Sequence, residues 1–176
     1  DTPAVQLAVH DIIQSGKPVV SVNSDVPDSG RICYVGTNYL GAGKTAAGMT
    51  NFIIHSPLKI LIITGSYNIR GHKERIKGFE EGLNSHKIDY TIVDTIEAED
   101  DDDFSYSKTK DFLKTNSEIN CIFVAAAGST GVCQAVEELN RKDIHVIAFD
   151  EVPSIKKYIQ SGLIKFTIGQ EPELQG

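Results

Sequence analysis

Residues Gly43–Thr45 read Gly-Lys-Thr and follow a strand-like run, "RICYVG", so they raise the possibility of a phosphate-binding loop. In such a loop, G-x-x-x-x-G-K-[ST], successive backbone N–H groups wrap the phosphates before a helix begins. The spacing requires a glycine at position 38, where this sequence has Asn38. The run "HVIAFDE" ends in two carboxylates at 150–151, as a magnesium-holding strand would, but that feature serves many ligands. A nucleotide hydrolase is therefore only a remote alternative.

The small residues of 41–48 have a structural explanation instead. Glycine inside a helix costs about 1 kcal/mol relative to alanine, and a close approach to a neighbouring element can offset that cost. We expect this helix to pack closely on a sheet, with Thr37 or Asn38 as its N-cap.

The segment "RGHKER", Arg70–Arg75, has the densest set of polar groups. His72 and Glu74 have the spacing of a zinc deaminase pair, but the partner P-C-x-x-C is absent. The acidic run Glu97–Asp103 lacks the ligand alternation of a calcium loop and is expected to be a solvated loop. We therefore predict no metal and no cofactor. The alternatives for Arg75 are a solvated helix face or a planar fork that binds hydroxyls or carboxylates.

Composition narrows the function classes. The net charge of −7 argues against this chain binding nucleic acid unaided. No apolar run approaches the roughly 20 residues that span a bilayer, so no membrane association is expected. Cys33, Cys121 and Cys133 lie in apolar contexts without paired spacing, which predicts buried cysteines and a reducing, cytoplasmic compartment. No nucleophile–base arrangement is recognisable by spacing, so we predict that the protein is not an enzyme.

Short apolar runs alternate with amphipathic segments along the whole chain. This pattern predicts an α/β fold with a doubly wound parallel sheet covered on both faces. In such sheets ligands bind outside the carboxyl ends of the strands. The expected strands are 18–23, 31–35, 59–64, 90–96, 119–124, 145–149 and 165–168, and the expected helices are 4–15, 39–55, 72–85, 105–115, 129–140 and 154–161.

Four strand-end motifs occur in the order of one superfamily: "GKPVVSVNSDVPDSGRICYVGTNYLGAGKTAA", "ILIITGSYNIRGHKERIKGFEEGL", "IFVAAAGSTGVCQAVEEL" and "VIAFDEVPSIKKYIQSGLIKFTIGQEP". Together they resemble the effector-binding core of LacI-family transcription regulators and the related ribose-type periplasmic sugar-binding proteins. The resemblance implies Rossmann-like lobes of the type I periplasmic-binding-protein fold. It also implies a truncated chain, in which 1–36 are the tail of the N-terminal lobe with the hinge crossover. Residues 37–169 would be the C-terminal effector-binding lobe, and 170–176 would start the return hinge.

The resemblance implies a function without catalysis. The segments "SVNSDVPDSGRICYVG" and "GHKERIKGF" favour the effector-binding domain of a regulator. The resemblance implies a homodimer, whose operator DNA contacts lie in a headpiece outside this chain. A small-molecule effector, a sugar or sugar derivative, would control DNA binding by lobe closure. The alternative is a periplasmic solute-binding protein that serves an importer or a sensor.

The resemblance assigns the family's ligand-binding positions to individual residues of this sequence. Asn23, with Ser24 beside it, ends the strand "PVVSVN", where the family often has Asp-Arg. Arg75 matches the ligand-binding arginine at the start of the "ER…GF" helix. Asp150 matches the aspartate that closes the "GFD" strand, and Gln170 matches the glutamine after the last strand. These residues form the expected set of planar hydrogen-bonding groups for a sugar.

One position departs from the family. Where the family usually has Asn-Asp after the "IFV" strand, this sequence reads "AAAGST", and Ser129 is the expected substitute. Tyr67 and Phe104 are possible aromatic contacts, and each could equally anchor its own loop. The departure leaves the identity of the ligand open.

Overall fold

The computed structural model describes residues 3–55 and 57–175 and has an α/β architecture. Five parallel strands form the main sheet in the order β4-β3-β5-β6-β7. The order reverses at β3, which is the doubly wound arrangement with a topological switch point between β3 and β5. The predicted fold class is confirmed. The strands are β3 (Leu58–Thr64), β4 (Tyr90–Glu97), β5 (Cys121–Val124), β6 (His145–Phe149) and β7 (Ile164–Ile168).

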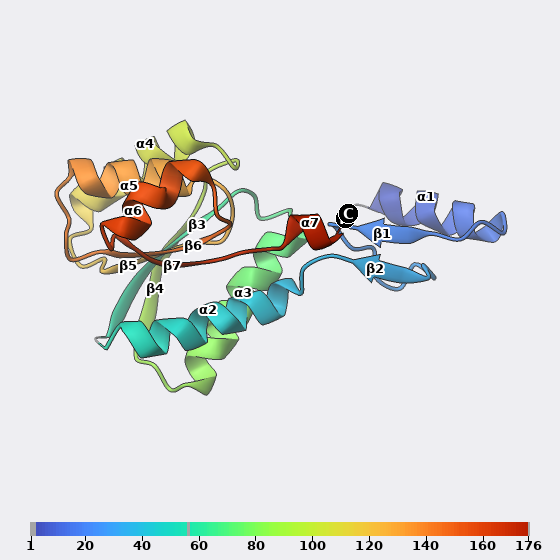
Figure 1. The fold of residues 1–176 in the computed structure, drawn as a ribbon, viewed down its shortest axis with the longest axis horizontal. Coiled ribbons are helices and arrows are strands. Elements are labelled where there is room, and N and C mark those ends of the chain that lie inside the picture. Colours follow the sequence, from blue (N-terminus) through green and yellow to red (C-terminus); the bar gives the residue numbers. More distant parts are fainter. Residues whose placement is uncertain (1–2, 56, 176) are drawn as a thin grey trace.

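Helices cover both faces of this sheet, as Figure 1 shows. One face packs against α2 (Tyr39–Ile53) and α3 (Arg70–Ser85) through a core that includes Phe79, Phe123 and Phe149. The other face packs against α4 (Asp102–Thr115), α5 (Ser129–Glu138) and α6 (Lys156–Gln160). Burial on both sides explains why β3 and β5 are apolar without alternation.

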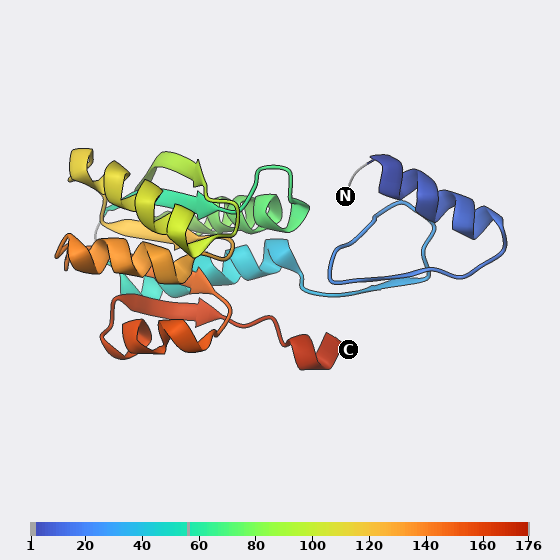
Figure 2. The same ribbon diagram turned by 90° about the horizontal axis from the view of Figure 1, so that it is seen from above.

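The first part of the chain forms a separate small unit. It consists of α1 (Pro3–Gln14), β1 (Val20–Val22) and β2 (Cys33–Val35), and the two strands pair in parallel. Figures 1 and 2 show this unit projecting from the end of the main sheet. Residues 36–38 connect it to α2, and α7 (Pro172–Gln175) returns to the same connection, where Gln175 Nε2 lies 3.4 Å from Thr37 Oγ1.

Three local expectations differ from the structure. The acidic run is not only a solvated loop, because α4 begins at Asp102 and the Asp101 side chain accepts a hydrogen bond from the Phe104 N–H. The expected helix 154–161 is divided into a short 3-10 turn, Pro153–Ile155, followed by α6. Cys33 is exposed in β2, contrary to the expectation, whereas Cys121 and Cys133 are buried as predicted.

Gly43 of α2 packs against α3, which corrects the expectation for this glycine, whereas Ala46 and Ala47 pack in the core against the sheet as expected. A Cβ on Gly43 would lie 2.1 Å from the Arg75 carbonyl oxygen, and one on Gly78 would lie 2.1 Å from the Leu40 carbonyl oxygen. Glycines on both helices therefore allow direct backbone contact. Asn38 caps α2 as predicted, because its Oδ1 accepts from the Gly41 N–H at 2.8 Å.

Candidate ligand-binding site

Arg75 lies on α3 at the carboxyl edge of the sheet, and its side chain is buried. The residue is 4% exposed, and its Nη1 donates to the Ala125 carbonyl just after β5 at 2.9 Å. The guanidinium carbon lies 4.2 Å from the ring centroid of Phe149 and 5.1 Å from that of Tyr39. Burial lowers the pKa of Arg75, and the nearby carboxylate of Asp150 opposes this effect. The solvated helix face is therefore excluded for Arg75.

The hydrogen bonding of this guanidinium is incomplete. Within the part of the chain that the structure describes, the buried Nε of Arg75 has no hydrogen-bond partner. A buried donor without a partner costs free energy, and the cost is larger for a charged group. The guanidinium can therefore still donate a hydrogen bond to an acceptor such as a hydroxyl oxygen.

Asp150 and Gln170 meet at the ends of the two neighbouring strands β6 and β7. Asp150 Oδ1 accepts from Gln170 Nε2 at 2.6 Å, and Gln170 Oε1 lies 3.4 Å from the Thr37 hydroxyl. The backbone of Asp150 has φ +66°, a left-handed conformation that aspartate tolerates better than most residues, and its carbonyl accepts from Thr167 Oγ1. The structure thus brings together Arg75, Asp150 and Gln170, as the sequence predicts.

Asn23, which precedes the connecting residues 36–38 in the chain, is linked to this group through Tyr39. It also has a left-handed backbone, with φ +65°. Its carbonyl oxygen accepts from the hydroxyls of Tyr34 at 2.8 Å and Tyr39 at 2.9 Å, and its Oδ1 lies 3.4 Å from the Tyr39 hydroxyl. Burial raises the pKa of Tyr34 to about 12, so its hydroxyl remains a donor at neutral pH. Tyr39 therefore links Asn23 to Arg75.

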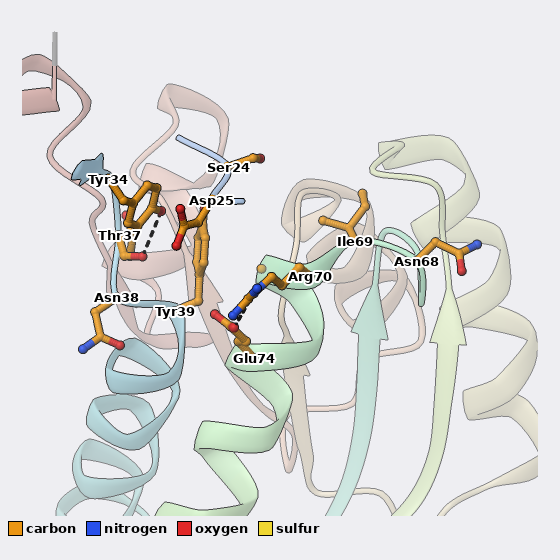
Figure 3. A pocket seen from close by; sticks show the side chains of 12 residues that line it. Ser24, Asp25, Tyr34, Thr37, Asn38, Tyr39, Asn68, Ile69, Arg70 and Glu74 are labelled. Atoms are coloured by element: carbon orange, nitrogen blue, oxygen red, sulfur yellow. Dashed lines mark hydrogen bonds and ion pairs between the residues drawn. The ribbon is translucent and has the colours of Figure 1, made fainter. Parts of the chain in front are cut away.

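A cavity of about 660 Å³ lies beside this cluster. Its volume falls in the range of roughly 300–1,000 Å³ that is typical of small-molecule sites. Figure 3 shows the pair of Arg70 and Glu74 on α3, joined at 2.6 Å, and Tyr34 beside Thr37. The lining residues are Ser24, Asp25, Tyr34, Gly36, Thr37, Asn38, Tyr39, Asn68, Ile69, Arg70, Gly71 and Glu74.

The cavity and the cluster share a wall. Ser24 is a predicted site residue that lines the cavity. Tyr39 and Thr37 line the cavity and also contact the cluster, Tyr39 at Arg75 and Thr37 at Gln170. Among the described residues, Arg75, Asp150 and Gln170 do not line the cavity themselves, so the cavity meets the cluster at this shared wall.

The remaining predicted residues lie elsewhere on the carboxyl edge. Ser129 is the first residue of α5 and is 5% exposed. The Tyr67 hydroxyl donates to the Thr95 carbonyl on the edge strand β4, so this ring anchors its own loop. Phe104 is 47% exposed in the first turn of α4. A role of these three residues in ligand binding stays a prediction.

Sequence reasoning missed Tyr39 and did not assign Thr37 to the site. Both follow the strand that leads out of the first unit, and an aromatic residue at the start of the next helix was a usable signal. The sequence could not show that the Tyr39 ring lies against both Gly71 and Arg75, because these contacts join separate helices.

Within 3–55 and 57–175, no group of three or more His, Cys, Asp or Glu side chains could hold a metal ion. In the same residues, no helix is long and apolar enough to cross a membrane.

The sequence and the fold both match known protein families. A family model described as a periplasmic binding protein domain matches residues 1–176. The chain belongs to this family. Among curated relatives of the domain, the ribose import binding protein RbsB of Haemophilus influenzae is 22% identical over 160 residues, covering 90% of this chain and 54% of the relative. RbsB of Escherichia coli is 21% identical over 177 residues, covering 100% of this chain and 59% of the relative.

Solved structures superpose closely on the domain. The XylFII molecule has a TM-score of 0.89 at 31% identity, over 97% of this chain and 63% of that chain. GanP, a glucose-galactose binding protein from Geobacillus stearothermophilus, has a TM-score of 0.89 at 29% identity, over 97% of this chain and 61% of that chain. The domain thus spans somewhat more than half the length of these relatives.

Proposed function

We propose that the chain is the larger part of a solute receptor that binds a sugar and performs no chemistry on it. The observation that carries the proposal is the buried guanidinium of Arg75, with its unpartnered Nε, beside the hydrogen-bonded pair of Asp150 and Gln170. A carboxylate accepts from sugar hydroxyls, a guanidinium donates to them, and an amide does both. The names of the relatives support the same ligand class, since they are binding proteins for ribose, glucose and galactose.

Closure on the ligand would use residues 36–38, which connect the first unit to α2. Asn23 precedes these residues in the chain, whereas Arg75 and Gln170 follow them, and Tyr39 and Thr37 contact residues from both sides. A ligand that contacts both sides favours the closed arrangement by its differential affinity for that arrangement.

Calorimetry on the full-length protein with D-ribose, D-glucose, D-galactose and D-arabinose tests this proposal. We expect one or more of these sugars to bind. We expect Arg75→Lys and Asp150→Asn each to weaken binding at least about 100-fold, because a charge-assisted hydrogen bond contributes about 1.5–3 kcal/mol and its buried partner is left unsatisfied. Lys44→Ala, which changes a partly exposed lysine on α2, is the matched control and keeps full affinity. Unchanged affinity in either site variant contradicts the proposal.

For the output of binding, we favour delivery to an importer or a sensor over control of an operator. The sequence favoured a regulator of the LacI type, but the curated relatives named above are import binding proteins. We therefore expect the gene to encode an export signal upstream of Asp1. A helix-turn-helix headpiece encoded there would restore the regulator interpretation.

A further inference from the structure

The switch point between β3 and β5 is lined by small residues from its own two strands. Gly65 follows β3, and Ala125–Ala127 follow β5. At such a point the loops diverge and leave a crevice that ligands use in doubly wound sheets. The polar side chains near the ends of β3 and β5 come instead from α3 and from the loop before α4.

The Asp100 carboxylate lies beside the ends of both strands. Its Oδ1 accepts from the Ala127 N–H at 3.1 Å, and a Cβ added to Gly65 would lie 2.3 Å from its Oδ2. Glu99 and Asp100 both have left-handed backbones, with φ of +56° and +58°. Consecutive strained residues of this kind persist where the surrounding structure holds them, and they are concentrated at functional sites.

His72 faces the same carboxylate from the first turn of α3. Its side chain is 12% exposed, and its Nδ1 accepts the Ser66 N–H at 3.4 Å. The proton of the neutral ring is therefore on Nε2. Burial, and secondarily the charge of Arg75, hold the pKa of His72 below its usual value although Asp100 opposes them, so the ring is neutral at pH 7.

We propose that His72 Nε2–H and the Asp100 carboxylate form a subsite for one hydroxyl group of the ligand, next to Arg75. Nε2 lies 3.8 Å from Asp100 Oδ1, which is too far for a direct hydrogen bond. A hydroxyl oxygen at about 2.8 Å from each atom bridges this distance, since it accepts from Nε2–H and donates to the carboxylate.

This inference rests on the proposed function and narrows the ligand class to neutral polyols. The subsite requires one group that is both donor and acceptor. A carboxylate or phosphate is repelled by Asp100, and an ammonium group offers His72 no acceptor. The pair would thus select a neutral sugar over the corresponding uronic acid or amino sugar at that position.

The test uses the full-length protein and whichever of the four sugars named above binds, together with the complete set of its monodeoxy analogues. We expect the wild type to bind one analogue about tenfold or more weakly than the parent sugar, as the loss of a hydrogen bond to a charged group predicts. We expect His72→Ala and Asp100→Ala to bind the parent sugar about tenfold more weakly and to lose this particular discrimination. His72→Gln, which replaces Nε2–H with an amide donor, should restore part of it.

The controls are Lys73→Ala and Asp103→Asn, exposed neighbours of the two subsite residues, and both should behave as the wild type. Thermal unfolding of each variant separates local from global effects. If His72→Ala and Asp100→Ala keep the wild-type discrimination against every analogue, the subsite is wrong even when Arg75→Lys abolishes binding. If the wild type binds none of the four sugars, the proposed function fails and the subsite fails with it.

Discussion

The segments 41–45 on α2 and 70–75 on α3 look similar in the sequence, because each combines glycine with basic side chains. In the structure, Lys44 pairs with Glu81 at 2.9 Å and its side chain is 50% exposed, while Gly43 contacts the backbone of α3. Arg75 is 4% exposed, and its Nε has no hydrogen-bond partner among the described residues. The two segments therefore differ in burial and in the completeness of their hydrogen bonds, and not in the presence of a basic residue.

The largest effect expected from this comparison concerns packing in the first segment. Gly43→Ala places a Cβ 2.1 Å from the Arg75 carbonyl oxygen, so α2 and α3 must separate. We expect the free energy of unfolding to fall by about 3 kcal/mol, the upper part of the usual range for overpacking. Chemical denaturation measures this change.

Gly48→Ala on the same helix is the matched control for Gly43→Ala. Its added Cβ would meet His86 Nε2 at 3.5 Å, an ordinary contact. Removal of a helical glycine should then stabilise the protein by about 0.5–1 kcal/mol. Equal effects of the two substitutions would show that the glycines of α2 are not needed for close packing.

A smaller effect concerns the second segment and depends on pH. Burial lowers the pKa of His72, so the unfolded chain binds a proton at a higher pH than the folded protein does. The stability from neutral His72 is fully present above about pH 6.5 and is lost as the pH falls toward the folded pKa. Unfolding free energies between pH 7.5 and 5 should therefore decrease, and decrease less in His72→Gln.

His145 contributes to the same pH dependence of stability, because burial lowers its pKa and the charge of Lys165 lowers it further. The His72→Gln variant should thus retain part of the pH dependence, and a double variant with His145→Gln should retain less. A pH profile of His72→Gln identical to that of the wild type would show that His72 is not held neutral by its surroundings.

The smallest effect is expected at Lys44. The Lys44–Glu81 pair is partly exposed, and pairs of this kind contribute about 0–1 kcal/mol. Lys44→Ala should change the free energy of unfolding by less than about 0.5 kcal/mol. Titration of this variant and the wild type with ATP and magnesium should show no binding to either, and tight binding that Lys44→Ala abolishes would revive the nucleotide interpretation.

Much of the fold was predictable because strands buried on both faces leave a continuous apolar signal. The runs "KILIIT" and "HVIAF" gave strands β3 and β6 nearly to the residue. Helix starts were less predictable: α4 begins three residues before its expected start, because the Asp101 side chain caps it. Capping by one carboxylate within an acidic run leaves no distinct periodic signal.

Part of the candidate site was also predictable. Asp150 and Gln170 lie one and two residues after apolar strands, and parallel strands bring their carboxyl ends to one edge. The pairing of His72 with Asp100 was not predictable, because it depends on a loop conformation with two consecutive left-handed residues. The contact of Tyr39 with Arg75 likewise depends on how closely α2 and α3 approach.

By itself, the sequence determined the order of strands and helices and the residues that end each strand, since apolar periodicity and chain direction are local properties. Only the tertiary structure decided which of those residues are buried without a full set of partners. Gly43 and Gly78 allow the backbones of α2 and α3 to lie in contact. This close packing places Arg75 between the rings of Tyr39 and Phe149. Such burial arises from several elements together, so no single segment encodes it.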